Sequence, residues 1–179
     1  MIFFISLIFS LMLLVPKDCP QGWVLFGSLC YLLLDTPTSE WNDAQSLCQT
    51  HGAHLPIMRS ADENNFMLSL VMSQPNGKVS GTWLGLTRRK PIGDFYWVDD
   101  TPLEGQFSAW ADGEPNNPLV ENCANIFMTG KRQGKWNDCF CSVPANSSPV
   151  VLCQKKPLWV TFISRALTRW IYNYWGSFH

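Results

Sequence analysis

An apolar N-terminal run followed by seven cysteines most constrains the fold of this 179-residue chain. Residues 2–15 are apolar except for Ser6 and Ser10. The run is shorter than the about 20 residues that cross a bilayer, so it favours a signal-peptide core. We expect residues 1–18 to be a cleaved signal peptide, with an uncleaved membrane anchor as the alternative. Export places the cysteines in an oxidising compartment where they pair, and their odd number leaves at least one free or bonded to another chain.

Length and composition indicate a single domain with tails. Hydrophobic residues make up 46% of the chain, including 9 Trp and 11 Phe, which is enough for a sizeable core. The formal net charge is −1. A nucleic-acid binder normally carries a basic face, so we expect no nucleic-acid partner.

Two stretches in the first half of the chain predict helices. Residues 41–48 place apolar side chains at helical spacing, and Gly52 marks the end of this helix. Ser60 and Glu63 have the spacing of a capping box, and an apolar face follows them. The second helix should therefore run over about residues 61–73.

Short strands and one long loop are expected around these helices. Cys19 and Cys30 bracket a strand-like run at residues 24–26, which favours a small hairpin closed by a disulfide. Residues 99–122 are rich in Pro, Gly, Asn and Asp, and a loop of this length inside a domain is usually functional or disordered. The other candidate strands are residues 83–86, 95–98, 123–127, 134–136 and 150–153. This order predicts an α+β domain over residues 19–156.

An acidic and amide-rich set follows, made up of Glu114, Asn116, Glu121, Asn137 and Asp138. Residues two apart in an extended chain share a face, so Glu114 and Asn116 can face one point, and Pro115 stiffens the link. Such oxygens suit Ca²⁺, which takes about six to eight of them. Neighbouring carboxylates repel one another without a cation, although three separate solvated turns are the alternative. Strand alternation would send Asn137 and Asp138 to opposite faces, so their joint use does not follow from spacing.

Several landmarks occur together and in a fixed order: Trp41, Ala44 and Cys48, residues 52–55, residues 83–86, residues 114–116, residues 121–123, residues 136–138, and Leu152 with Cys153. In this combination the chain resembles the C-type lectin domain family. The additional Cys19 and Cys30 are similar to the long form of the family, which has an N-terminal hairpin. The resemblance implies two helices, small antiparallel sheets and a long irregular calcium-binding loop region, stapled by disulfides.

The family pattern also implies the cysteine pairing. It pairs Cys48 with Cys153 and Cys123 with Cys141, in addition to Cys19 with Cys30. Cys139 is then unpaired, and it either stays free or bonds to another molecule. A bridge from Cys123 to Cys139 is the alternative, but it would crowd Asp138.

The resemblance gives the acidic and amide-rich set a role. In sugar-binding members, one Ca²⁺ is held by the residues that match Glu114, Asn116, Glu121, Asn137 and Asp138. The first four of these also match residues that contact sugar hydroxyls. Glu-Pro-Asn at residues 114–116 resembles members that prefer mannose, fucose, glucose or N-acetylglucosamine, and Pro115 would follow a cis peptide bond.

Many relatives hold a further calcium ion with acidic residues around the long loop. The matching region here has Arg88, Arg89, Asn117 and Asn122 instead. Cations and neutral amides replace the expected carboxylates, so we expect that second site to be absent or weak.

The resemblance therefore implies a secreted lectin that binds mannose-type glycans in a calcium-dependent manner, for which innate recognition is a natural setting. A calcium-independent protein-binding or structural domain is the alternative. Paired carboxylates such as Glu114 and Glu121 can also serve glycoside hydrolysis, but calcium ligation would keep both ionised and leave no general acid, so we expect no enzyme. His51 and His54 lie near Cys48, but a disulfide at that cysteine removes it as a zinc ligand.

Three features lie outside this core pattern. Asn146 begins an N-glycosylation acceptor sequence in a loop-like stretch. Residues 157–179 carry aromatic and apolar side chains at helical spacing, so they are either a helix that contacts a membrane or a partner, or an artefact of the reading frame. A single sugar site binds weakly, and a homo-oligomer built through Cys139 or this tail would raise avidity.

Overall fold

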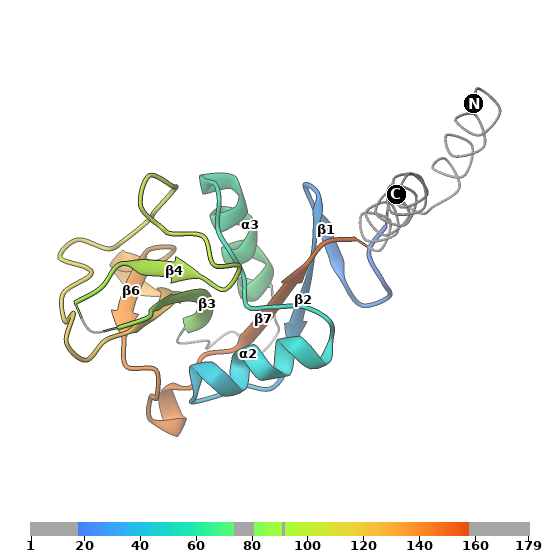
Figure 1. Ribbon diagram of the computed structural model, residues 1–179. Coiled ribbons are helices and arrows are strands. Elements are labelled where there is room, and N and C mark those ends of the chain that lie inside the picture. Colours follow the sequence, from blue (N-terminus) through green and yellow to red (C-terminus); the bar gives the residue numbers. More distant parts are fainter. Residues whose placement is uncertain (1–17, 74–80, 91, 158–179) are drawn as a thin grey trace, which may run out of the picture. The chain divides into compact units, whose positions relative to one another are not determined.

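The computed structural model describes residues 18–73, 81–90 and 92–157 (Figure 1). Nearly all of the expected signal peptide and of the C-terminal tail lies outside these residues. Within them, no helix combines the length and the apolar character that a membrane crossing requires. The described residues divide into two compact units, one with residues 18–30 and 156–157 and the other with Tyr31–Lys155.

The first unit contains the predicted disulfide-closed hairpin. Cys19 is bonded to Cys30, and the Trp23 amide donates to the Pro20 carbonyl at 3.0 Å. Strand β1 (Val24–Phe26) is the hydrogen-bonded neighbour of β2 (Leu29–Leu34), whose first two residues belong to this unit. The prediction of a small hairpin is confirmed.

Two helices lie in the second unit, where they were expected. Helix α2 spans Trp41–Thr50, and α3 spans Ala61–Met72. At the start of α3 the Ser60 hydroxyl accepts from the Glu63 amide at 3.2 Å. The Glu63 carboxylate accepts from the amide of Arg59 at 2.6 Å, one residue earlier than in a standard capping box. Side-chain caps thus set the start of this helix.

The larger sheet of the second unit contains four antiparallel strands in the order β4-β3-β5-β6. Its strands are β3 (Gly81–Arg88), β4 (Phe95–Trp97), β5 (Cys123–Phe127) and β6 (Trp136–Cys139). In the smaller sheet β2 is the neighbour of β7 (Val151–Lys155). The strand expected at residues 134–136 begins only at Trp136, as β6, because Gly134 adopts a left-handed φ of 79° just before it.

An aromatic cluster forms the core beneath the long loop. Trp136, the first residue of β6, is fully buried, and its ring centroid lies 5.7 Å from those of Trp97, Phe107 and Trp110. Its indole nitrogen donates to the Asn64 side chain at 2.8 Å. Phe107 and Trp110 therefore pack on the core, and the start of β6 is firmly held.

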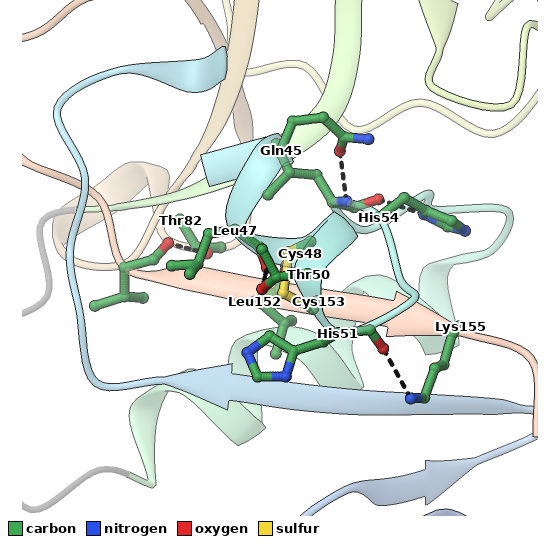
Figure 2. Close-up of a disulfide and its surroundings, with 12 residues drawn as sticks. Gln45, Leu47, Cys48, Thr50, His51, His54, Thr82, Leu152, Cys153 and Lys155 are labelled. Atoms are coloured by element: carbon green, nitrogen blue, oxygen red, sulfur yellow. Dashed lines mark hydrogen bonds between the residues drawn. A yellow bond between two sulfur atoms is a disulfide. The ribbon is translucent and has the colours of Figure 1, made fainter. Parts of the chain in front are cut away.

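The other two disulfides form as the family pattern implies. Cys48 is bonded to Cys153, which joins α2 to β7, and Cys123 is bonded to Cys141. Figure 2 shows the first of these, together with Lys155, whose ammonium donates to the His51 carbonyl at 3.0 Å. With Cys48 in a disulfide, it cannot serve as a zinc ligand.

Candidate functional site

Three residues of the expected calcium site, Glu114, Asn116 and Glu121, come from a loop that is anchored to β6, and Asn137 and Asp138 belong to β6 itself. The Ala111 amide donates to the Trp136 carbonyl at 2.9 Å, and the Trp136 amide donates to the Ala109 carbonyl at 2.8 Å. Two residues beyond this anchor, Gly113 adopts a φ of 85°, which favours glycine. The peptide bond between Glu114 and Pro115 is cis, as the resemblance implied. The loop therefore presents its acidic segment next to the buried start of β6.

Asp138 joins this loop to the sheet. It lies opposite Ala124 of β5, and its side chain is 0% exposed. Its Oδ1 accepts from the backbone amide of Asn116 at 2.9 Å. The structure thus brings Asn116 and Asp138 together through the backbone of Asn116.

Glu114 is the second buried carboxylate, with a side chain that is 4% exposed. Its Oε1 lies 3.4 Å from Arg132 Nη1, and its Oε2 is buried with no hydrogen-bond partner. Burial raises the pKa of Glu114 above its usual value, the Asp138 carboxyl raises it further, and Glu121 adds to the rise while Arg132 opposes it. The carboxyls of Glu114, Asp138 and Glu121 are therefore close enough to repel one another.

Asn137 is the predicted site residue that the structure links least to the others. It lies next to Asp138 on β6, opposite Asn125 of β5, and it is half-buried. Within the described residues its side chain makes no hydrogen bond to the other four candidates. This agrees with the expectation from strand alternation, because neighbours in a strand point to opposite faces.

Arg88, at the end of β3, is a partner of the site that the sequence did not reveal. Its Nη1 donates to the Glu121 carbonyl at 2.6 Å and to Asp138 Oδ2 at 3.2 Å. The Arg88 side chain is only 6% exposed, and its guanidinium lies 4.2 Å from the ring centroid of Phe95, its cross-strand neighbour. One buried cation thus connects the long loop to β6. The only sequence signal was that Arg88 stands in a region where many relatives carry acidic calcium ligands.

The residue types of the predicted set are ones that a divalent cation such as Ca²⁺ takes as ligands. A buried carboxylate oxygen without a partner, beside two further carboxylates, is the environment that a cation stabilises. In the described part of the chain, no three His, Cys, Asp or Glu side chains form a metal cluster by themselves. The amide oxygen of Asn116 would have to complete the set. Asn137 would join it only through a twist at the end of the strand or through its backbone carbonyl, because alternation points its side chain away from Asp138.

Replacing Glu114 by glutamine should change the pH dependence of folding stability, measured with a chelator present to remove calcium. Because the folded pKa of Glu114 is raised, the native state holds a proton in a window where the unfolded chain has lost it, so stability falls as pH rises through that window. We expect Glu114→Gln to flatten this fall and to raise the melting temperature at pH 7. Melting curves between pH 4.5 and 7.5 measure the effect. Asp112→Asn, at an exposed position in the same loop, is the control, and an unchanged pH profile in Glu114→Gln would contradict the assignment.

Cys139 is free and buried, next to the same carboxylates. Burial raises the pKa of its thiol to about 12, and the charges of Glu121, Asp138 and Glu114 contribute to the rise. A buried, protonated thiol is a poor nucleophile. In this fold Cys139 is therefore poorly placed to form a bond to another molecule.

The remaining candidates lie where their predicted roles can still apply. The backbone carbonyl of Asn122 accepts from the backbone amide of Arg88 at 2.8 Å. The side-chain oxygen of Asn122 is buried without a hydrogen-bond partner. Arg89 pairs with Asp100 at the surface. Asn146 is exposed within a short 3-10 helix, Ala145–Ser147. The weak or absent second calcium site and glycosylation at Asn146 both stay predictions.

The family is shown by comparison with known proteins. Residues 38–155 match the lectin C-type domain, so the chain belongs to the C-type lectin domain family. It is 38% identical over 133 residues to mouse C-type lectin domain family 4 member E, covering 73% of this chain and 59% of that protein. It is 34% identical over 142 residues to mouse C-type lectin domain family 6 member A, covering 79% and 63%. The matches thus span about 60% of these two relatives.

Solved structures confirm the fold. The C-type lectin domain of murine dendritic cell inhibitory receptor 2, solved in complex with N-glycan, has a TM-score of 0.65 at 29% identity and covers 78% of this chain and 99% of that one. The cow carbohydrate-recognition domain of CD23, solved in the presence of GlcNAc2Man3, has a TM-score of 0.62 at 28% identity, covering 79% and 98%. A calcium-independent type II antifreeze protein has a TM-score of 0.65 at 25% identity, covering 81% and 99%. The same fold thus serves sugar-binding and calcium-independent proteins.

Proposed function

We propose that this domain binds mannose-type glycans through a single Ca²⁺. The observation that carries the proposal is the buried, unpartnered Oε2 of Glu114 beside the carboxyls of Asp138 and Glu121. Glu114, Glu121 and Asp138 would supply carboxylate oxygens, and Asn116 and Asn137 would supply amide oxygens. The ion would offer coordination positions to two adjacent sugar hydroxyls.

The same side chains can replace the hydration of a sugar. Ionised carboxylates accept hydrogen bonds from hydroxyls, and an amide whose oxygen faces the ion keeps its NH₂ group free to donate. Each hydroxyl that loses water on binding therefore finds a partner, which is needed because an unpaired polar group disfavours binding. Glu114, Asn116, Glu121 and Asn137 have this role in the proposal. The Glu-Pro-Asn sequence favours mannose, fucose, glucose or N-acetylglucosamine, and two related structures were solved with an N-glycan or GlcNAc2Man3.

The proposed setting is outside the cell, in a secreted or membrane-anchored protein. The three disulfides support this proposal, because such bonds persist in oxidising compartments. Binding rather than catalysis is proposed, since calcium ligation would leave Glu114 and Glu121 without the proton that a general acid needs. Several copies in one assembly would compensate for a weak single site.

A calcium-independent protein-binding or structural role is the second candidate. It is favoured by the two arginines that already pair with the acidic residues, Arg88 with Asp138 and Arg132 with Glu114. The calcium-independent antifreeze neighbour shows that the fold does not require the ion. Calcium dependence of binding separates the two candidates.

A mannose column tests the proposal with the full chain. We expect retention with calcium at about 0.1–1 mM or above, the usual range for extracellular modules, and release by a chelator. Glu114→Gln should lose retention at a calcium concentration that suffices for the parent, whereas Asp112→Asn should keep it. Equal retention on the column with and without chelator, together with no calcium uptake in calorimetry, would reject the proposal and favour the second candidate.

A further inference from the structure

Arg132 lies at the rim of the candidate site. It ends a short 3-10 helix, Gly130–Arg132, and its guanidinium lies 5.4 Å from the ring centroid of Phe127. Its side chain is 56% exposed, whereas that of its partner Glu114 is 4% exposed. The 3.4 Å contact between them therefore joins a buried carboxylate to a cation that faces solvent.

Arg88 and Arg132 should differ in whether they keep their carboxylate partner when a divalent ion binds. Arg88 is buried with Asp138, so it should keep that partner when the ion binds. Glu114, Glu121 and Asp138 carry three negative charges, and Arg88 together with a divalent ion supplies three positive charges. The acidic set is then balanced without Arg132, so an exposed guanidinium remains beside the site with no counter-charge.

We propose that Arg132 makes the site prefer glycans that carry an anionic group, a carboxylate or a sulfate, next to the hydroxyls that bind. This inference rests on the proposed calcium-dependent sugar binding and adds the substrate class to it. Guanidinium matches the planar oxygens of such anions through two parallel hydrogen bonds. Because Arg132 is exposed, the gain should be about three- to fivefold in affinity and should shrink as salt is added.

Competition for mannose resin tests this inference on the calcium-saturated full chain. The probes are methyl α-mannoside against its 6-sulfate, and glucose against glucuronate, in low salt and in about 0.5 M salt, where screening is strong. We expect each anionic sugar to compete about three- to fivefold better than its neutral partner in low salt. Arg132→Gln should remove this advantage and leave competition by the neutral sugars unchanged. Lys131→Gln is the matched control, because it removes one exposed positive charge from the adjacent residue, which forms no ion pair within the described residues.

The outcomes separate the two proposals. If neutral sugars compete in a calcium-dependent manner but the anionic forms are no better, or if Arg132→Gln keeps their advantage, the preference for anions is wrong and the sugar site stands. If no sugar competes, the proposed function fails and this inference fails with it. A second readout needs no sugar: the Nε–H signal of Arg132 in ¹⁵N spectra should shift as calcium replaces chelator, in step with calcium uptake. If the signal does not move, the inference that bound calcium frees Arg132 from Glu114 is wrong.

Discussion

Alanine at both Cys48 and Cys153 should lower the free energy of unfolding by about 4–5 kcal/mol. This disulfide closes a loop with a sequence separation of 105, and in the chain-entropy model such a long loop restricts the unfolded chain strongly. A loss of this size is a large part of the about 5–15 kcal/mol that stabilises a typical domain. Urea denaturation followed by tryptophan fluorescence measures it.

The Cys19–Cys30 disulfide provides the control for loop length. Its sequence separation is 11, so alanine at both positions should cost less, about 2–3 kcal/mol in the same model. Equal losses from the two double variants would show that loop length does not determine the stabilisation here.

Methionine in place of Arg88 should destabilise the protein in chelator by about 3–5 kcal/mol. The change leaves the fully buried Asp138 carboxylate without its cation, and removing one partner of a buried ion pair is far more harmful than removing both. It also removes the donor to the Glu121 carbonyl, so the loop loses a tie to β3. We expect a smaller loss in saturating calcium, because an ion at the site would neutralise Asp138.

Arg89 offers a neighbouring control for this prediction. Its ion pair with Asp100 lies at the surface, with side chains 51% and 85% exposed, so Arg89→Met should cost at most about 1 kcal/mol. A double-mutant cycle with Arg88→Met and Asp138→Asn in chelator gives the coupling directly. If Arg88→Met proves as harmless as Arg89→Met, Arg88 does not hold the site together.

Much of the fold could be predicted because its signals are local. The capping pattern at Ser60 and Glu63 and the apolar spacing that follows define α3 within a few residues, and both helices appear where they were expected. The boundaries of β6 could not be predicted, since they depend on pairing with β5, from Cys139 opposite Cys123 to Trp136 opposite Ile126. The shift leaves the expected alternation of Asn137 and Asp138 unchanged, because both residues lie within β6.

The sequence by itself determined the order of the elements, the three disulfides through the family pattern, and the types of oxygen donor available to an ion. The tertiary structure alone decided which of these donors meet. It buries Asp138 and Glu114 next to each other, brings Arg88 from β3 into contact with both Asp138 and Glu121, and leaves Arg132 at the rim. The physical reason is that charge pairing acts through space, between residues 18 to 50 positions apart here, while the spacing of residues along the chain reports only on near neighbours.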